Sequence, residues 1–284
     1  MPELPEVETI RAQLAERITG RTIREMEVVD AKLAEPATPE ALVAAVRGRK
    51  IDAVTRRGKY LIWEFPDGDA LALHLRMTGR LHWRPGPPEE PPPFLRATFD
   101  LDDGATMTFS DLRRFGRAWM LPADPADRED YWRGRVGPEP LARSYSGRDL
   151  AQAVARRGGP VKAVILNQAV IAGVGNMYAD EALFQARIHP ERPASSLTDD
   201  EAKLLHRAIR DRLRVAIAHG GASIDDYRDG LGNKGQMQEQ LRVHLHEGEP
   251  CPRCRTTIVK TRVAQRGTYT CPSCQPRHPG RSGS

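Results

Sequence analysis

The residues that open the chain, MPELPEVETI, could carry nucleophilic chemistry. Removal of Met1, which the small residue behind it favours, would leave the secondary amine of Pro2 as the terminus. An α-amino group titrates at about pH 7.7–8.0, so part of it is neutral at pH 7, whereas a lysine side chain is almost wholly protonated. Such an amine can attack the C1′ carbon of a sugar, and the adjacent Glu3 could act as acid and base. A loose chain end without function is the alternative that these residues leave open.

Other candidates lie where strands are expected to begin or end. Lys59 follows Gly58 ahead of an apolar strand, where it could hold a phosphate or simply lie exposed. Met77 in HLRMTGR, and Arg113 and Phe115 in SDLRRFGRAWM, stand among polar residues and glycines. Side chains of these types could wedge into a base stack and fill the space left by an extruded base. Core packing of Met77 and Phe115 is the alternative.

Two glycine-rich segments precede or follow expected helices. In AGVGNMYADEALF, two glycines and Asn176 come directly before a helix. Backbone N–H groups at such a helix start can bind a phosphate, although many ordinary turns share the pattern. Residues 230–235, GLGNKG, form a second segment of this kind, which is typical of a loop or of a substrate lid.

The four cysteines of the chain form two C-x2-C pairs separated by sixteen residues. This spacing is typical of a four-cysteine zinc site, and the intervening residues are long enough for a β-hairpin. The predicted ligands are Cys251, Cys254, Cys271 and Cys274. Four protein ligands leave no open position, so we expect one structural Zn²⁺. Two disulfides are the alternative, which a cytoplasmic chain disfavours.

The composition indicates a soluble, cytoplasmic protein. The 284 residues suffice for two modest domains, and no apolar run approaches the roughly 18–20 residues of a membrane span. The net charge is +5, and from Cys251 onward there are seven Lys or Arg and no acidic residue. Such a basic segment favours a polyanionic partner, with a solubilising surface as the alternative.

Periodicity predicts an α+β fold. Val7, Ile10, Leu14 and Ile18 have helical spacing, which predicts a helix over 6–18. Six short β-type runs follow, and they favour an antiparallel β-sandwich; the runs are IDAVTRR, YLIWEF, ALALHL, RATFDL, ATMTF and RAWML.

The second half is predicted to be helical, with a buried helix over 160–171 and a longer one that a Thr198–Glu201 capping box begins. The proline-rich loop 84–93 is expected to be exposed. The expected domains are a catalytic β-sandwich (1–135), a linker (136–150), a helical DNA-binding domain (151–235), a zinc-finger hairpin (236–275) and a disordered tail (276–284).

Taken together, these motifs resemble the formamidopyrimidine-DNA glycosylase family, whose relatives include the endonuclease VIII group. The resemblance extends to about residue 275, and the opening PELPEVE is similar to the formamidopyrimidine branch. The motifs that carry it occur in the family's order: MPELPEVET, RRGKYL, HLRMTGR, RRFG, GPEPL, GVGNMYADEALF, IHPERPASSL and AQRGTYTCPSCQ.

The resemblance implies a helix–two-turn–helix element in the helical domain and a role for each candidate residue. By it, Pro2 attacks C1′ of the damaged nucleotide through a Schiff base, and Glu3 assists as acid and base. Lys59 contacts a phosphate and assists β-elimination, and Arg266 of the zinc hairpin assists the second elimination. One amine nucleophile thus accounts for both glycosylase and lyase steps without a catalytic metal.

The same resemblance implies the DNA contacts. Met77, Arg113 and Phe115 match void-filling residues, and Arg113 faces the orphaned cytosine. Lys162 and Asn176 match positions that contact phosphate. Arg157 stands where the family has a basic DNA-contacting residue.

Two departures from the family pattern concern DNA and base contacts. Phe94 stands where the family often has a histidine that contacts phosphate, and Met237 stands where an aromatic residue is common. In addition, DLRRFG replaces the more usual Asp-Pro-Arg-Arg-Phe-Gly.

The sequence therefore predicts a bifunctional DNA glycosylase/AP lyase that removes oxidised purines, such as 8-oxoguanine and formamidopyrimidines, with β,δ-elimination. Its expected partner is double-stranded DNA with oxidised bases or abasic sites, bound by a monomer in the bacterial cytosol or nucleoid. Two alternatives stay open: the same chemistry on oxidised pyrimidines, or a non-catalytic zinc-finger protein that binds damaged DNA.

Overall fold

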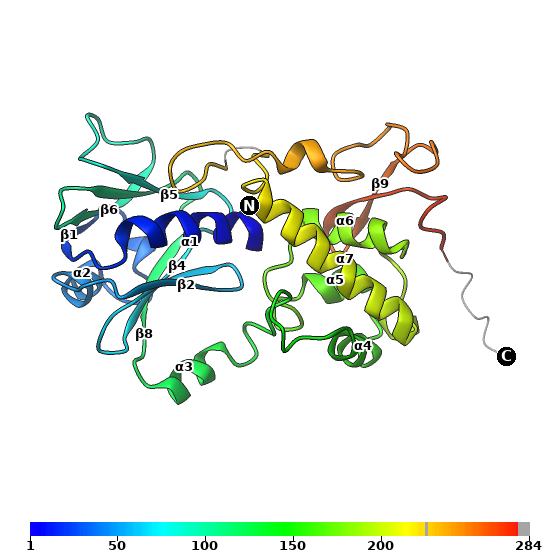
Figure 1. Ribbon diagram of the computed structural model, residues 1–284, viewed down its shortest axis with the longest axis horizontal. Coiled ribbons are helices and arrows are strands. Elements are labelled where there is room, and N and C mark those ends of the chain that lie inside the picture. Colours follow the sequence, from blue (N-terminus) through cyan, green and yellow to red (C-terminus); the bar gives the residue numbers. More distant parts are fainter. Residues whose placement is uncertain (225–226, 278–284) are drawn as a thin grey trace. The chain divides into compact units, whose positions relative to one another are not determined.

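The computed structural model describes residues 1–224 and 227–277, and Figure 1 labels their helices and strands. The chain divides into two compact units. The first comprises Met1–Arg133 with Ala216–Gln238, and the second comprises Gly134–Val215 with Glu239–Ser284. Among the described residues, no helix combines the length and the apolar character that crossing a bilayer requires.

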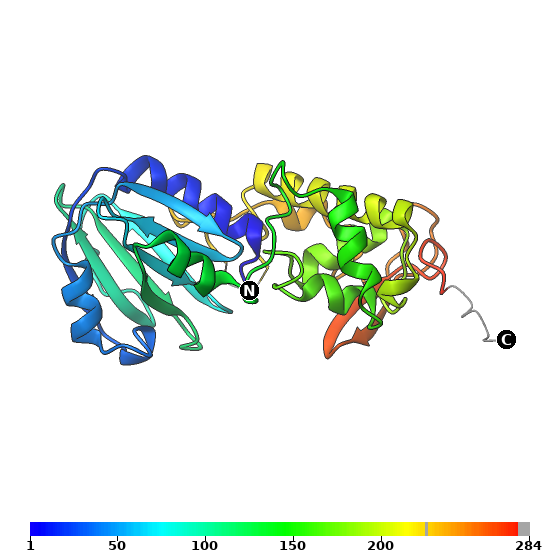
Figure 2. The same ribbon diagram turned by 90° about the horizontal axis from the view of Figure 1, so that it is seen from below.

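The first unit is a β-sandwich of two four-stranded antiparallel sheets (Figure 2). One sheet has the order β1 (Ile23–Val28), β6 (Leu95–Leu101), β7 (Thr106–Asp111) and β5 (Gly79–Arg84). The other has the order β2 (Ala53–Arg57), β3 (Tyr60–Glu64), β4 (Ala70–His74) and β8 (Arg117–Leu121). The predicted sandwich is confirmed, and all six predicted strands are present.

The sequence did not predict β1 and β5. In β1 only Ile23 and Met26 are buried, three residues apart, because a register shift between Ile23 and Glu25 interrupts the pairing with β6. A bulge of this kind removes the strict alternation by which a strand is recognised. In β5 the alternation is intact but short, and it begins at a glycine.

Helix α1 (Leu4–Ile18) packs on the core that the two sheets share. Its buried face consists of the residues whose spacing predicted it, namely Val7, Ile10, Leu14 and Ile18. It begins two residues earlier than predicted because Glu3 is the N-cap and Pro5 fits the first turn. The remaining elements of this unit are η1 (Ala31–Leu33), α2 (Pro39–Val46) and α3 (Pro125–Trp132).

The second unit is helical and ends in a hairpin. Its elements are α4 (Gly147–Ala155), α5 (Val161–Leu166), α6 (Asn176–Ala186), η2 (Ala194–Ser196), most of α7 (Asp199–Ala218), the end of η3 (Met237–Gln240), β9 (Val259–Val263) and β10 (Arg266–Thr270). The predicted capping box is confirmed: the Thr198 N–H donates to Glu201 Oε2 (2.8 Å) and the Glu201 N–H donates to Thr198 Oγ1 (3.2 Å).

The helix predicted over 160–171 is wrong in extent, because α5 ends at Leu166. The next residue, Asn167, has extended ψ and accepts the Ala169 N–H at its side-chain oxygen (3.0 Å), which favours a turn over another helical turn.

Two domain boundaries differ from those expected. Helix α4 begins at Gly147, inside the expected linker, and residues 216–224 and 227–235 belong to the first unit instead of the helical one. There the Trp83 N–H donates to Gly230 O (2.8 Å) and the Gly230 N–H donates to Gln13 Oε1 (2.9 Å). The helical pattern of α7 runs through the boundary without a break, so the sequence gives no sign of it.

The expected tail from residue 276 lies mostly outside the described residues, which end at 277. Gln275, two residues before the end of the described part, is buried. Its Nε2 donates to Ile188 O (2.9 Å) and its Oε1 accepts the Cys271 N–H (3.1 Å). The loop 84–93 is largely exposed, as predicted.

Candidate active site

Pro2 and Glu3 are both buried, directly before the first turn of α1. Glu6, which the sequence analysis did not single out, organises them. Its Oε2 accepts the Glu3 N–H (2.8 Å) and its Oε1 accepts the Ala222 N–H (2.9 Å). The spacing Glu3-x-x-Glu6, which forms a capping box, was the available signal. Glu6 therefore fixes the N-terminus against the segment that follows α7.

Pro2 lies in the wall of a cavity of about 260 Å³. Met77 and Arg113, two of the predicted wedge residues, line the same cavity. The other lining residues are Met1, Thr78, Gly79, Arg80, Ile224 and Tyr227. The structure thus brings together a candidate nucleophile at residue 2 and two side chains suited to displacing a base.

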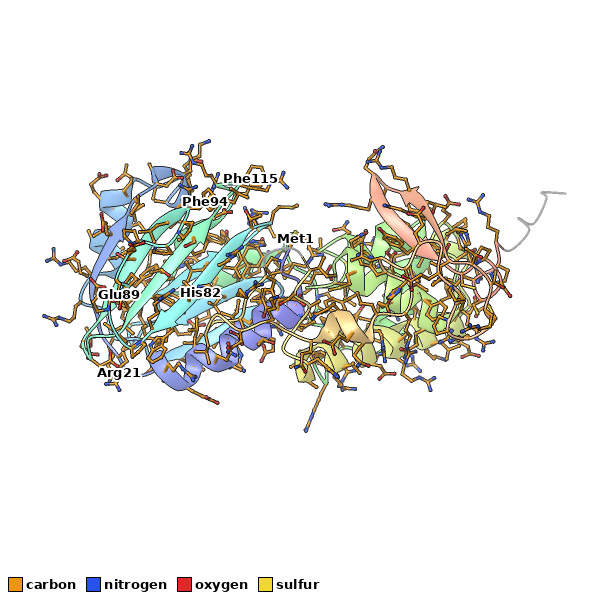
Figure 3. All side chains as sticks on the ribbon, turned by 90° about the horizontal axis from the view of Figure 1, so that it is seen from above. Met1, Arg21, His82, Glu89, Phe94 and Phe115 are labelled. Atoms are coloured by element: carbon orange, nitrogen blue, oxygen red, sulfur yellow. The ribbon has the colours of Figure 1, made fainter. Side chains whose placement is uncertain are left out.

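Arg113 and Phe115 lie at the surface, in the loop between β7 and β8; Figure 3 labels Phe115. The Arg113 guanidinium lies over the Phe115 ring, 4.8 Å from its centroid. Phe115 is 46% exposed, so it is not a core residue. Phe94 is also exposed (53%), with a φ of 60°, a conformation rare for a bulky residue. Met237, the other departure, is fully buried.

Lys59 lies at the turn between β2 and β3, after Gly58 with its φ of 57°. It is 7% exposed, not the freely exposed strand-end residue that was the alternative. It lies near His74, whose pKa its charge helps to lower. The structure places Lys59 at a strand end, as the sequence indicates, but not in the lining of the Pro2 cavity.

His74, at the end of β4, supports the turn that carries Met77. Its Nδ1 accepts the Arg76 N–H (2.9 Å), and Arg76 has a φ of 54°. Burial lowers the pKa of His74 to about 3, and the charges of Arg76 and Lys59 act in the same direction. The imidazole is therefore neutral near pH 7, as an acceptor at Nδ1 must be.

In the second unit, Lys162, Asn176 and the start of β10 come together. Lys162 is fully buried: its Nζ pairs with Asp180 (2.7 Å) and donates to Gly267 O (3.0 Å) and Thr268 Oγ1 (2.8 Å). The Asn176 Nδ2 donates to the same Gly267 carbonyl (3.0 Å). Its ammonium is thus enclosed and already paired, and the phosphate contact expected of Lys162 stays a prediction.

Arg266, the first residue of β10, is exposed beside the hairpin tip. The two tip residues, Ala264 and Gln265, both have positive φ (47° and 62°), as mirror-image two-residue turns require. Arg157 lies elsewhere in this unit, at the end of α4, where its guanidinium donates to Ala153 O (2.5 Å). It lines an open groove together with Arg156.

The four cysteines converge as predicted. Their sulfur atoms lie within 4.8 Å of one another, and separations of 3.4–3.9 Å between Sγ atoms are recorded. Zn–S bonds of about 2.3 Å in a tetrahedron require sulfurs about 3.8 Å apart, so the cluster fits one structural Zn²⁺. The four residues are Cys251, Cys254, Cys271 and Cys274.

Three families of known domains match the chain in succession. Residues 1–118 match the formamidopyrimidine-DNA glycosylase N-terminal domain, residues 136–228 its H2TH domain, and residues 248–277 the zinc finger found in FPG and IleRS. The formamidopyrimidine-DNA glycosylases of Heliobacterium modesticaldum and a Roseiflexus species are 45% and 43% identical, over 97% of this chain and 100% of each relative.

Solved structures agree. A complex of Lactococcus lactis Fpg with abasic-site DNA has a TM-score of 0.89, and a MutM complex with carbocyclic 8-oxo-G DNA has 0.88. Each is 35% identical to this chain, with coverage of 97% of this chain and 100% of the other.

The fold, the zinc cluster and the matches with known families and solved structures define a zinc-finger enzyme of DNA repair. The chain belongs to the formamidopyrimidine-DNA glycosylase family, and it is a bifunctional DNA glycosylase and AP lyase that repairs oxidised purines. The predicted family, fold class and enzyme type are confirmed.

The neutral state of His74 predicts a pH-dependent stability. Because its pKa in the folded chain is about 3 and its ordinary value is 6.5, its contribution is complete above pH 6.5 and declines as the pH falls toward 3. At pH 5 the loss is about 2 kcal/mol. All four tryptophans lie in Met1–Arg133, so tryptophan fluorescence during urea unfolding measures the first unit. The stability difference between wild type and His74→Gln should shrink by that amount from pH 7 to pH 5; a constant difference would contradict the assignment.

The zinc cluster predicts one zinc per chain by elemental analysis. Cys271→Ser should lose the metal and with it the DNA affinity that depends on the hairpin, because the four sulfurs fix the hairpin base. Urea unfolding followed by tryptophan fluorescence should be unchanged, since that signal comes from the other unit. Full zinc content in the variant would contradict the ligand set.

The buried position of Lys162 predicts that Lys162→Met destabilises the second unit by about 3 kcal/mol, because Asp180 stays buried with its cationic partner removed. Far-UV circular dichroism during urea unfolding reports both units, whereas tryptophan fluorescence reports the first alone, so a transition that shifts only in circular dichroism measures the second unit. The double variant Lys162→Met/Asp180→Leu should recover stability. Normal stability of the single variant, with a DNA-binding salt slope reduced by about one, would instead support a phosphate contact.

Proposed function

We propose that Pro2, once Met1 is removed, is the nucleophile of both reactions. The observation that carries the proposal is the cavity in which Pro2 lies beside Met77 and Arg113. A terminal amine is partly neutral at pH 7, so it needs no base to activate it. With Met1 in place, the Pro2 nitrogen is an amide and cannot attack.

The proposed reaction starts when the Pro2 nitrogen bonds to C1′ and the bond from C1′ to the damaged base breaks. The amine gives up its proton, and the base leaves with a proton. The product is an aminal, and it opens when the C1′–O4′ bond breaks and O4′ takes a proton from Glu3, which leaves an iminium between Pro2 and C1′. The iminium acidifies C2′, so loss of a C2′ proton expels the 3′-phosphate. Loss of a C4′ proton then expels the 5′-phosphate, and water hydrolyses the iminium to return the free Pro2 amine. In this scheme Glu3 is the acid and base that opens the sugar, and Lys59 and Arg266 serve the two eliminations and hold phosphates.

We propose the same residues for DNA recognition as the sequence indicates, except Lys162. Met77 and Phe115 would fill the space of the extruded base, and Arg113 would face the orphaned base. Asn176 and Arg157 would contact phosphates. The partner is double-stranded DNA with an oxidised base or an abasic site, bound by one copy of the chain in the bacterial cytosol. The exposed, stacked pair of Arg113 and Phe115 supports this assignment.

The nucleophile is tested by borohydride trapping on an 8-oxoguanine duplex. Wild type should form a covalent complex, and Glu3→Gln should excise the base at least roughly a hundredfold more slowly. Pro2→Gly should trap much less, although glycine keeps a terminal amine. A chain with one extra residue before Pro2 should not trap at all, yet should still bind the duplex.

Intact mass establishes whether Met1 is absent in each preparation. Undiminished trapping by the extended chain, or a crosslinked peptide that does not contain residue 2, would contradict the proposal.

A further inference from the structure

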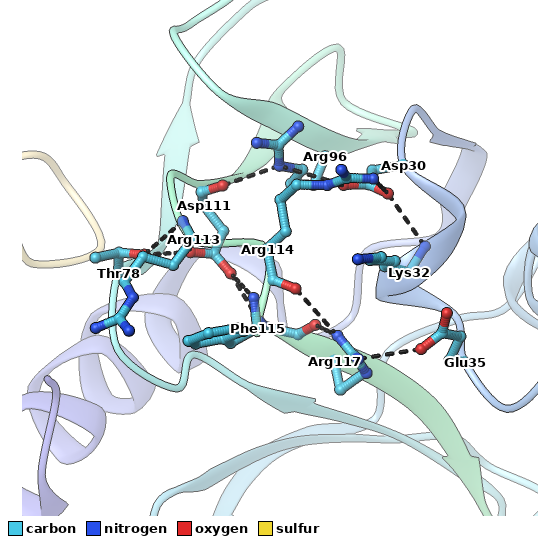
Figure 4. Close-up of polar contacts among 11 residues, drawn as sticks. Asp30, Lys32, Glu35, Thr78, Arg96, Asp111, Arg113, Arg114, Phe115 and Arg117 are labelled. Atoms are coloured by element: carbon cyan, nitrogen blue, oxygen red, sulfur yellow. Dashed lines mark hydrogen bonds and ion pairs between the residues drawn. The ribbon is translucent and has the colours of Figure 1, made fainter.

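The loop between β7 and β8 and the turn between β4 and β5 converge on one buried carboxylate, that of Asp111 (Figure 4). Asp111 is 1% exposed. Its Oδ2 accepts the N–H groups of Phe115 (2.8 Å) and Gly116 (2.7 Å), and its Oδ1 accepts the Arg113 N–H (3.1 Å). The loop that carries two of the proposed wedge residues is therefore folded around this side chain.

The same carboxylate reaches the turn that carries the third wedge residue. The Thr78 hydroxyl donates to Asp111 Oδ1, and Thr78 Oγ1 in turn accepts the Arg113 N–H (3.0 Å). Thr78 follows Met77 directly in the chain, and 33 positions separate Thr78 from Asp111. Asp111 thus joins the Met77 turn to the loop of Arg113 and Phe115.

Neighbouring groups leave this arrangement little freedom. A Cβ on Gly116 would lie 2.7 Å from the Phe109 ring and 3.1 Å from Asp111 Oδ2, so only glycine allows the amide to approach the carboxylate. The backbone of Asp111 is also fixed: its N–H donates to Phe94 O (2.9 Å), and its carbonyl accepts from Arg96 Nε (2.9 Å).

Exposed side chains need hydrogen bonds of this kind to hold the backbone that carries them. Phe115 is 46% exposed, so packing in a core cannot hold it in place. Inserted side chains displace a stacked base only if they keep their positions against the stack. Hydrogen bonds inside a buried, low-dielectric site hold the backbone that carries them in place.

We propose that Asp111 is a positioning residue for base extrusion, an inference that rests on the proposed function. Its carboxylate joins Met77, Arg113 and Phe115 into one rigid wedge. Asp111 itself touches neither substrate nor the reacting atoms. The proposal separates two steps, since the wedge is needed to extrude a damaged base but there is no base to extrude at an abasic site.

The test uses the full chain with Met1 removed and the variant Asp111→Asn, in which an amide NH₂ replaces one of the acceptor oxygens. We expect single-turnover excision of 8-oxoguanine from duplex to fall at least roughly tenfold, because buried N–H donors lose their acceptor. Cleavage of the same duplex with a preformed abasic site should fall less than about threefold. The fluorescence rise of 2-aminopurine next to the lesion, which follows base unstacking, should be slowed with excision.

A second variant, Thr78→Val, breaks only the link between the turn and the loop and should show the same selective loss. Two matched controls change groups of the same chemical types outside the wedge. Asp100→Asn alters a carboxylate that accepts the Thr106 hydroxyl on the same sheet, and Thr108→Val removes a buried hydroxyl that has no partner among the described residues. Both controls should keep the wild-type ratio of excision to abasic cleavage.

A wild-type ratio in folded Asp111→Asn, or an equal loss of both activities in folded protein, would overturn the proposal. If Asp111→Asn does not fold, Thr78→Val alone decides, and a wild-type ratio there overturns it. Failure of the wild type to trap would overturn the proposed function instead, and the 2-aminopurine signal would then decide on the wedge.

Discussion

Buried carboxylates that accept backbone N–H groups hold the functional loops of this chain. The side chains that must reach a substrate are exposed, so the hydrophobic core that shapes the sandwich cannot fix them. Glu6 fixes the N-terminus against residue 222, and Asp111 fixes the loop of Arg113 and Phe115. In the second unit Glu181 Oε1 accepts three successive N–H groups, from residues 242 to 244. Removing one donor from a buried acceptor costs free energy, so the hydrogen bonds to these carboxylates restrict the motion of each loop.

The choice of donor also matters for charge. A carboxylate that is satisfied by neutral N–H groups does not neutralise a basic side chain, whereas one that pairs with arginine or lysine does. Both kinds occur here. Asp30 binds Arg114 at two atoms (2.6 and 2.9 Å), and Asp180 binds Lys162, so these cations are part of the structure. Asp111, by contrast, holds Arg113 by its backbone N–H, which leaves the guanidinium at the surface over Phe115. Phosphate binding depends on cations whose charge is not neutralised by a carboxylate of the protein.

Features that depend on short spacing could be predicted from the sequence. The cysteine pairs, the capping box at Thr198, the face of α1 and six of the strands all follow from residues a few positions apart. Features that depend on distant partners could not. Glu6 and Ala222 are 216 positions apart, and nothing near Asp111 in the sequence indicates that Thr78 lies beside it. Lys162 illustrates the limit: the family resemblance implies a phosphate contact for it, but in the structure Asp180 and the hairpin enclose it.

The enclosure of Lys162 changes how the hairpin must be understood. The zinc cluster fixes one end of the hairpin, through cysteines that flank β9 and β10. Lys162 and Asn176 fix the other end, because both donate to the Gly267 carbonyl, one residue beyond Arg266. The tip residues Ala264 and Gln265, close to Gly267 in the chain, have positive φ, which for non-glycine residues costs conformational energy. Anchors at both ends can sustain such a tip where the zinc alone would leave it free to relax. The position of Arg266 therefore depends on a buried lysine as well as on the metal.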